Sequence, residues 1–261
     1  MKSFLDKIFF RSNNLNNISQ NIRDLTNNTP AKKIFDAINN YSSESEIRYV
    51  GGCVRKIINK EKIDDIDLAT NLEPNQICET LNKNNINYHE TGVRHGTITA
   101  LIDDYKFEIT SLREDIETDG RHAKVKFSKN WKEDSLRRDF TINSIYSDKD
   151  GNLFDPHDGK KDLENGFVKF IGDSDKRIKE DYLRILRYIR FFLIYSKHPH
   201  SLETIRKLKI NIGGVSKISK ERLLDELRKI IKFDIIEKLS KDKLSSELIL
   251  IIFPELKNIN I

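Results

Sequence analysis

A single stretch, residues 49–70, restricts most strongly what this chain can fold into. An apolar run ends there in two adjacent glycines, Gly51 and Gly52, and a cation, Arg55, follows them. Glycines let backbone amides approach a ligand closely. Asp65 and Asp67 come next, and on a strand both carboxylates would share one face. A tight turn, a cation and paired carboxylates suit a metal-bound nucleoside triphosphate, although a glycine turn before an exposed edge strand gives the same pattern.

The bulk properties bound the class of protein. With 261 residues the chain fits one large domain or two small ones, and its net charge of +5 is compatible with a nucleic-acid partner without requiring one. Its two cysteines, Cys53 and Cys78, form no disulfide framework and show no metal-ligand spacing. Residues 1–10 lack the apolar core of a signal peptide, and the longest apolar run, Leu248–Phe253, is too short to span a bilayer. We therefore expect a soluble protein of a reducing compartment, the cytoplasm.

The hydrophobic periodicity predicts a mixed α/β region followed by helices. The expected strands are Ile47–Val50, Ile63–Leu68 and a hairpin of 95–102 with Lys106–Leu112; the expected helices include Ala31–Tyr41, one beginning at Val54 and one from Pro74 to Leu81. A composition shift near residue 166 divides the chain into an N-terminal helical segment (1–28), a head domain (29–165) and a helical neck (166–261).

Two segments carry further expectations. Glu114–Lys126 is charged and aperiodic, which predicts a solvated surface loop and a plausible lid. From Lys176 onward the pattern stays helical, with one apolar stripe of Ile185, Ile189 and Phe192. Ser219 is expected to cap a helix whose inward residues are Leu223, Leu224, Leu227, Ile230 and Ile231.

A third carboxylate, Glu108, lies on the second strand of the expected hairpin. Facing Asp65 and Asp67, it would complete a site for two Mg²⁺ ions, which prefer oxygen ligands and stabilise in-line displacement at phosphorus. The alternative is that Glu108 is only the polar face of a strand.

Adjacent arginines open the segment Arg137-Arg138-Asp139-Phe140-Thr141-Ile142-Asn143. They point different ways, so one can reach a triphosphate while the other pairs with a carboxylate or an RNA backbone. Such a triplet is often a surface ion-pair patch, but the apolar continuation places this one at the entrance of a structured element.

The segment from Lys179 to Arg190 places Asp181 and Arg184 three residues apart on an expected helix. An acceptor and a donor side by side suit the edge of a nucleobase, which makes the pair a candidate base reader. Arg187 and Arg190 continue the spacing beside apolar residues, so we expect them to be partly buried. Buried cations need anions, and we expect these two arginines to contact phosphate.

Together and in this order, these segments resemble the class II tRNA nucleotidyltransferases, which comprise the CCA-adding enzymes and their bacterial poly(A) polymerase relatives. The matching segments are Val50–Arg55 with Asp65–Asp67, Arg94–Thr97, Glu108–Arg113, Arg137–Asn143, Asp155-Pro156 with Asp162-Leu163, and Glu180–Arg187. The resemblance covers about residues 30–230.

The resemblance implies an α+β fold, with a polymerase-β-like nucleotidyltransferase head (a mixed sheet with helices) and an all-helical neck. It implies that CMP and AMP, taken from CTP and ATP, are added to the 3′ end of tRNA without a nucleic-acid template and with Mg²⁺ as cofactor. Residues 113–126 would form a flexible loop associated with switching from C to A addition.

The resemblance also implies a role for each matching residue. Asp65 and Asp67 would hold the metal, with Glu108 as the third catalytic carboxylate. The nucleotide-binding residues would be Gly51, Gly52 and Arg55 at the triphosphate, Arg138 and Asp139 on the ribose and phosphate side, Asp181 and Arg184 at the base, and Arg187 and Arg190 in support. Glu180 would orient its helix.

Two departures from the family pattern leave alternatives open. Lys56 stands where an acidic or amide residue is usual, and the sequence stops at Ile261, where relatives usually continue into domains that grip tRNA. Poly(A) polymerase, CC-only and A-only activities fit the same motifs. A non-catalytic RNA-binding relic is the alternative from another class, and an antibiotic nucleotidyltransferase is a more distant one.

Overall fold

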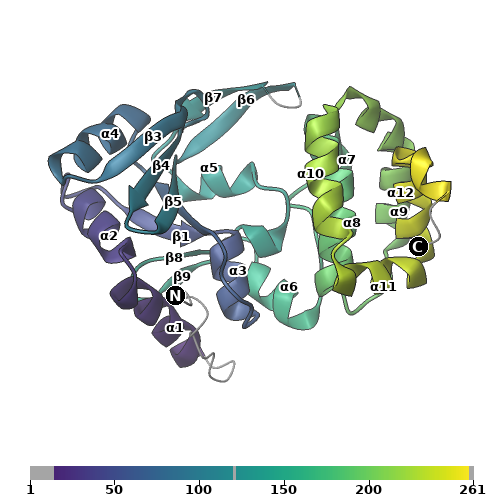
Figure 1. Ribbon diagram of the computed structural model, residues 1–261, viewed down its shortest axis with the longest axis horizontal. Coiled ribbons are helices and arrows are strands. Elements are labelled where there is room, and N and C mark those ends of the chain that lie inside the picture. Colours follow the sequence, from purple (N-terminus) through teal and green to yellow (C-terminus); the bar gives the residue numbers. More distant parts are fainter. Residues whose placement is uncertain (1–14, 120–121, 259–261) are drawn as a thin grey trace. The chain divides into compact units, whose positions relative to one another are not determined.

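The computed structural model describes residues 15–119 and 122–258 (Figure 1). The chain divides into two units, one within residues 1–116 and 124–161 and the other formed by 117–123 and 162–261. They are called the head unit and the helical unit below, and each is described by itself. The three domain ranges expected from the sequence stay a prediction.

The head unit contains a seven-stranded sheet in the order β3-β4-β5-β2-β1-β8-β9. β2 and β5 are parallel, and the other neighbouring strands are antiparallel. The strands are β1 (Ile47–Val50), β2 (Ile66–Thr70), β3 (Asn87–Gly92), β4 (Thr97–Ile102), β5 (Tyr105–Ser111), β8 (Tyr146–Ser147) and β9 (Leu153–Phe154). This mixed sheet confirms the α+β class.

Helices cover the sheet on the side where alternate strand residues are apolar. α2 and α4 contact β1, β3 and β4 (Figure 1), and a capping box between Glu73 and Gln76 begins α4. The helices are α1 (Leu15–Asn28), α2 (Ala31–Asn39), α3 (Gly52–Ile58), α4 (Pro74–Lys83), α5 (Trp131–Leu136) and α6 (Gly159–Asn165), with 3₁₀ turns η2 (Val93–His95) and η3 (Thr141–Asn143).

The other face of the sheet carries the candidate site. Side chains alternate along β2, so Asp67 and Ala69 lie opposite Ile66 and Leu68. Trp131 of α5 packs on this face in a buried cluster whose other members are Val50, Ala69, Leu112 and Tyr146. One end of the face is therefore closed by α5.

Two expectations for the head unit are wrong. β2 begins at Ile66, so Asp65 precedes the strand instead of sharing its face by alternation. The segment expected as a loop forms a two-stranded sheet of β6 (Arg113–Asp119) and β7 (His122–Phe127). A ribbon of two antiparallel strands bonds its own backbone and needs no apolar period, which explains why the sequence pattern missed it.

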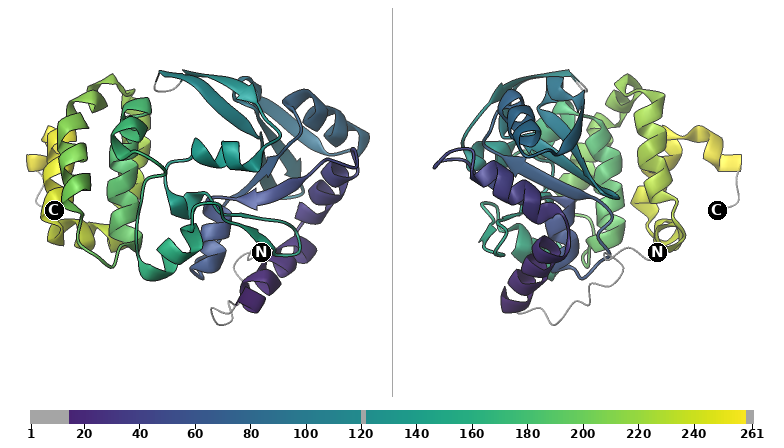
Figure 2. Two further views of the ribbon diagram at one scale, coloured as in Figure 1. Left: turned by 180° about the vertical axis from the view of Figure 1, so that it is seen from behind. Right: turned by 60° about the vertical axis from the view of Figure 1, so that its left-hand side comes forward.

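The helical unit packs α8 against α7, α10 and α11 (Figures 1 and 2). Its elements are α7 (Ser174–Glu180), α8 (Leu183–Tyr195), α9 (Leu202–Asn211), η4 (Ile212–Lys217), α10 (Lys220–Ile230), α11 (Phe233–Lys241), α12 (Lys243–Ile252) and η5 (Pro254–Asn258). The core includes Ile185, Ile189, Leu208 and Ile230. Among the residues that the structure describes, no helix has the length and apolarity to cross a membrane.

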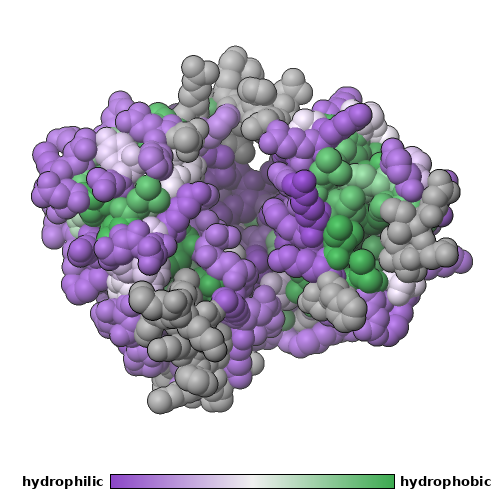
Figure 3. Space-filling model, in the orientation of Figure 1, coloured by the Kyte–Doolittle hydropathy of each residue, from purple (hydrophilic) through white to green (hydrophobic). Residues whose placement is uncertain are grey.

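Two expectations for this unit are also wrong. The helix expected to run through Asp181 is interrupted there, since α7 ends at Glu180 and Asp181 is extended (φ −152°, ψ 104°). On α10, Leu227 and Ile230 are buried, but Leu224 and Ile231 are 46% and 43% exposed. Figure 3 shows an apolar area on the surface of this unit.

Candidate active site

The Gly-Gly turn begins α3 beside a predicted metal ligand. Gly51 has φ +64°, a conformation that side chains disfavour, and lies at the helix N-cap. A Cβ on Gly52 would lie 3.7 Å from Oδ2 of Asp67 and 3.9 Å from Nη2 of Arg55. The turn therefore brings backbone, carboxylate and guanidinium together as the sequence predicted.

Strand register brings Asp67 and Glu108 together. The two residues are partners in the parallel pair β2·β5, so their side chains stand on the same face of adjacent strands. Burial, together with the charges of Glu108 and Asp65, raises the pKa of Asp67 to about 6 against the opposing effect of Arg138 and Arg55. The three predicted carboxylates thus repel one another electrostatically.

This donor set fits Mg²⁺, which prefers carboxylate oxygens and shares its coordination sphere with substrate phosphates. A divalent cation would also relieve the repulsion that raises the pKa of Asp67. In the described part of the chain, no three His, Cys, Asp or Glu side chains form a group able to hold a metal by themselves. Phosphate oxygens of a nucleotide are the further ligands that Mg²⁺ commonly takes beside one or two carboxylates.

A buried carboxylate, Asp134 of α5, holds the two adjacent arginines. It accepts from Nε of Arg137 (2.8 Å) and from Nη2 of Arg138 (3.1 Å), and Tyr146 donates its hydroxyl to it (2.7 Å). Burial alone would raise the pKa of Asp134, but the charges of both arginines and the Tyr146 hydrogen bond outweigh it and hold that pKa below its usual range. A Cβ on Gly51 would lie 3.5 Å from Nη1 of Arg138, which places this arginine at the Gly-Gly turn.

A second buried chain of polar groups fixes Arg55. Asn143 donates to Oδ1 of Asp139 (2.9 Å), and its own Oδ1 accepts a hydrogen bond from Arg55. All three side chains are buried. Asp139 and Arg55, both predicted nucleotide-binding residues, are therefore linked through Asn143.

Sequence reasoning missed Asp134, Tyr146 and the linking role of Asn143. A signal existed for Asp134, because Arg137 and Arg138 follow it at i+3 and i+4 and the segment is helical. Tyr146 had no comparable signal, since the sheet alone brings it to this place.

In the helical unit, Glu180 lies between two cations. Its Oε2 accepts from Nη1 of Arg184 (2.9 Å) and from Arg177. Arg184 also donates to the carbonyl of Arg177 (2.8 Å). The predicted orienting role of Glu180 has these contacts as its structural basis.

Asp181 is held from a distant helix. Arg222 of α10 donates Nη2 to its Oδ2 (2.7 Å), and Oδ1 accepts the backbone N–H of Leu183 (3.2 Å). The backbone N–H of Arg184 donates to the Asp181 carbonyl (3.0 Å). The two predicted base-reading residues therefore stay neighbours although no single helix contains both.

The later arginines meet one buried anion, Glu226 of α10, which is 2% exposed. Arg190 pairs with it, and Nη1 of Arg187 lies 4.0 Å from its Oε2. Arg190 also stacks over the Phe191 ring at 4.2 Å. Glu226, which sequence reasoning did not name, is therefore an anion beside these partly buried cations, and their contact with nucleotide phosphate stays a prediction.

Other expected residues have plain structural surroundings. Lys56 pairs with Asp64 at 2.8 Å, and His95 ends the 3₁₀ turn η2. The side chain of Arg94 lies outside the described residues. Cys53 and Cys78 are free.

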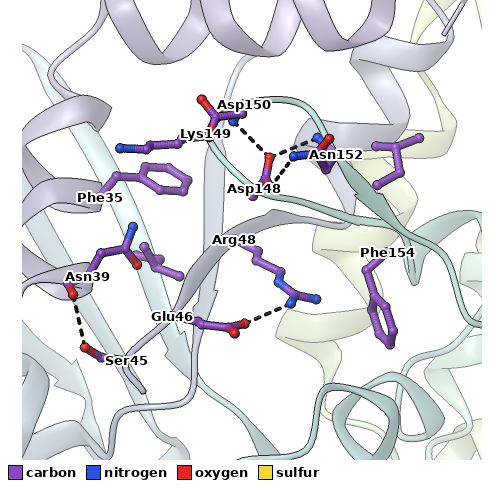
Figure 4. A pocket seen from close by; sticks show the side chains of 12 residues that line it. Phe35, Asn39, Ser45, Glu46, Arg48, Asp148, Lys149, Asp150, Asn152 and Phe154 are labelled. Carbon is purple, nitrogen blue, oxygen red and sulfur yellow. Dashed lines mark hydrogen bonds and ion pairs between the residues drawn. The ribbon is translucent and has the colours of Figure 1, made fainter. Parts of the chain in front are cut away.

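A cavity of about 520 Å³ lies in the head unit between the start of β1 and the β8–β9 hairpin (Figure 4). Its charged groups are engaged with one another: Arg48 pairs with Glu46 at 2.8 Å and stacks over Trp131 at 4.1 Å. Asp148 accepts from the backbone of Asp150 and Asn152. None of the predicted site residues lines this cavity.

Comparison with known proteins decides the family of the head unit. Residues 47–169 match the family described as the poly A polymerase head domain. This part of the chain belongs to that family. The human mitochondrial CCA tRNA nucleotidyltransferase 1 is 46% identical over 189 residues, which are 71% of this chain and 44% of that protein. A CCA-adding enzyme of Lactobacillus johnsonii is 38% identical over 189 residues, 71% of this chain and 46% of its own.

The solved structures agree with the fold. The Bacillus stearothermophilus CCA-adding enzyme in complex with CTP superposes with a TM-score of 0.67 and 26% identity over 84% of this chain and 49% of that one. A Thermotoga maritima CCA-adding enzyme complexed with tRNA has a TM-score of 0.63 at 22% identity, covering 85% and 52% of the two chains. The fold class expected from the resemblance is confirmed, and the chain spans about half the length of these relatives.

Proposed function

We propose that this chain is a template-independent nucleotidyltransferase that adds CMP and AMP to the 3′ end of tRNA. The observation that carries the proposal is the register pairing of Asp67 with Glu108 beside the Gly-Gly turn, in a poly A polymerase head domain. Relatives named as CCA-adding enzymes give the reaction class. The 3′-hydroxyl of the RNA attacks the α-phosphate of the nucleotide, and pyrophosphate leaves.

In the head unit, Asp65, Asp67 and Glu108 are proposed to hold Mg²⁺. When bound, the metal neutralises charge on the phosphates during displacement. Gly51 and Gly52 present backbone amides to the triphosphate, and Arg55 and Arg138 add positive charge beside it. Asp134 positions Arg138, and Asn143 links Arg55 to Asp139.

In the helical unit, Asp181 and Arg184 are proposed to read the incoming base. A carboxylate accepts from an exocyclic amine, which cytosine and adenine both carry, and a guanidinium donates to a ring nitrogen. Uracil and guanine present a carbonyl at that position, so they are disfavoured. Arg187 and Arg190 support this part of the site through Glu226.

Incorporation of each labelled nucleotide into three tRNAs, ending before CCA, after C and after CC, tests the proposal. With Mg²⁺ we expect sequential addition of C, C and A with no extension past A. With a chelator we expect no incorporation. A stop after CC, addition of A alone, or a run into poly(A) would each identify a specialised relative. No incorporation on any RNA would favour a non-catalytic RNA-binding protein.

The location is part of the proposal. The two free cysteines and the lack of a membrane-spanning helix in the described residues support a cytoplasmic protein. A relative named as mitochondrial makes cell fractionation the decisive measurement.

A further inference from the structure

A second cavity, of about 520 Å³, lies within the helical unit. It is bounded by the segment 167–174 before and at the start of α7, by α8, and by the start of α9. Its volume falls in the range of about 300–1,000 Å³ that small-ligand pockets occupy. None of the residues assigned above to nucleotide or metal binding lines it.

Aromatic rings in fixed orientations line this cavity. Phe167 and His198 stack with ring centroids 4.1 Å apart and an interplanar angle of 8°. Phe170 and Tyr188 stack at 5.6 Å and 12°. Phe167 keeps 37% of its surface exposed, so part of this stacked pair is open to solvent at the mouth of the cavity.

A hydrogen-bonded chain extends from Tyr188, one of these rings. The Tyr188 hydroxyl and Nδ1 of His200 are 3.1 Å apart, and Nε2 of His200 lies 2.9 Å from Oδ2 of Asp242. His200 also stacks on Phe192, a further lining residue, at 3.4 Å and 15°. His200 and Asp242 therefore connect the α8 part of the lining to the start of α12.

The surroundings of the cavity carry charges of both signs. Residues 162–261 contain 21 Lys and Arg against 15 Asp and Glu, and the whole chain has a net charge of +5. The net positive charge of the chain therefore lies in residues 162–261. Lys169 lies 4.8 Å from the Phe167 ring centroid. Hydroxyls of Ser174, Ser201 and Thr204 are also in the lining. Lys169 is the cation of the lining and pairs with Asp162 at 2.5 Å, and the acidic residues Asp173 and Glu203 also line the cavity. Aromatic rings on which bases stack are how proteins hold single-stranded nucleic acid, so the rings and not the local charge indicate the ligand.

We propose that this cavity binds an unpaired base of an RNA strand, stacked on the Phe167–His198 pair, with the adjoining phosphate near Lys169. The proposal rests on the proposed function and deepens it by giving its RNA partner a contact with residues that are not assigned to the incoming nucleotide. A purine is the preferred occupant because its larger ring system stacks over more aromatic surface.

Binding without turnover tests the proposal. Fluorescence anisotropy of labelled A₆ and U₆ RNA is measured on the full chain carrying Asp67→Asn, alone and with Phe167→Ala or Phe167→Trp. Leu202→Ala is the matched control, because Leu202 is a more exposed apolar side chain (86%) of the same unit that does not line the cavity. Thermal unfolding of each variant verifies the fold.

We expect Phe167→Ala to weaken A₆ binding five- to a hundredfold, the range for loss of one base–aromatic stack. Phe167→Trp should restore binding, Leu202→Ala should leave it unchanged, and A₆ should bind more tightly than U₆. Equal binding by the Phe167→Ala and Leu202→Ala variants would overturn the proposal, and displacement of A₆ by an equal concentration of free AMP would overturn its RNA assignment. The binding measurement involves no turnover, so its outcome does not depend on whether the incorporation assay succeeds or fails.

Discussion

In the head unit, Asp67 and Glu108 lie side by side on parallel strands, whereas in the helical unit Asp181 lies against Arg222. The first arrangement sets like charges together and raises the pKa of Asp67. The second offsets each charge with a partner from another element, as Glu226 does for Arg190. The head unit is therefore suited to recruit a cation, while the helical unit is suited to hold hydrogen-bonding groups in fixed directions without one.

Removing a carboxylate from the uncompensated cluster should have the largest effect. Asp67→Asn keeps the shape of the side chain but removes the charge that Mg²⁺ requires, so we expect turnover to fall about 10³-fold in the incorporation assay. Asp104→Asn makes the same chemical change at an exposed turn of the β4–β5 hairpin and should leave turnover unchanged. An Asp67→Asn protein with more than a tenth of wild-type turnover would exclude Asp67 as a metal ligand.

Asp134 differs from the candidate metal-binding carboxylates of the head unit, because the guanidinium groups of Arg137 and Arg138 offset its charge. Asp134→Asn leaves Arg137 and Arg138 without their buried anion and should lower the free energy of unfolding by about 3 kcal/mol at pH 7. The folded state holds the pKa of Asp134 below its unfolded value, so this stabilisation is present above about pH 4 and is lost as the pH falls through the lower, folded pKa.

Urea unfolding of wild type and variant from pH 7 down to pH 3 measures this dependence. The difference between the two proteins should narrow only at the acid end. Asp36→Asn, which removes an exposed pair with Lys32, is the control and should change stability by less than about 1 kcal/mol at any pH. A difference between wild type and Asp134→Asn that stays constant with pH would mean that the charge of Asp134 contributes nothing.

In the helical unit, Tyr182, the residue after Asp181, packs directly on Gly214. A Cβ on Gly214 would lie 2.0 Å from the Tyr182 ring, whereas a Cβ on Gly213 would meet nothing within 4 Å. We expect Gly214→Ala to displace Tyr182 and lower stability by about 1–3 kcal/mol, and Gly213→Ala to stay within about 0.5 kcal/mol of wild type. Thermal unfolding measures the stability of both variants. Equal stability would show that the Tyr182 ring moves away from residue 214 without loss of stability.

The sequence predicted the candidate residues of the head unit better than those of the helical unit, and the reason is physical. Asp67 and Glu108 lie on short strands with regular alternation, so the face of each side chain within its own strand followed from the sequence. The parallel pairing of β2 with β5, which brings the two side chains together, did not. The helix break at Asp181 did not follow either, because the i, i+3 spacing of the arginines continues across it. A signal was present in Asp181 itself, since an Asp just before a helix accepts from its first turn, as it does here from Leu183.

The compensating partners were beyond reach from the sequence. Arg222 lies 41 residues from Asp181, and Glu226 lies 36 residues from Arg190. Only the packing of α10 on α8 selects these two among the many charged residues of the chain. Expecting Leu224 and Ile231 to face inward was wrong for a related reason, because Glu226 occupies part of the buried side of α10.

The smallest expected effect is at Arg222, which we expect to act by positioning Asp181. Arg222→Ala removes the bond that fixes the Asp181 carboxylate, so KM for CTP and ATP should rise about tenfold, the worth of one charge-assisted hydrogen bond, with little change in kcat. Discrimination against UTP and GTP should fall, because a mobile carboxylate no longer selects an exocyclic amine. Arg222→Lys keeps a cation and should restore most of the selectivity, whereas Arg228→Ala, an exposed pair on the same helix, should change neither parameter. If Arg222 had only a structural role, Arg222→Ala would lower kcat for all four nucleotides together. An unchanged preference for CTP and ATP over UTP and GTP in Arg222→Ala would therefore refute the positioning role. Asp181 would then be positioned by its own backbone contacts.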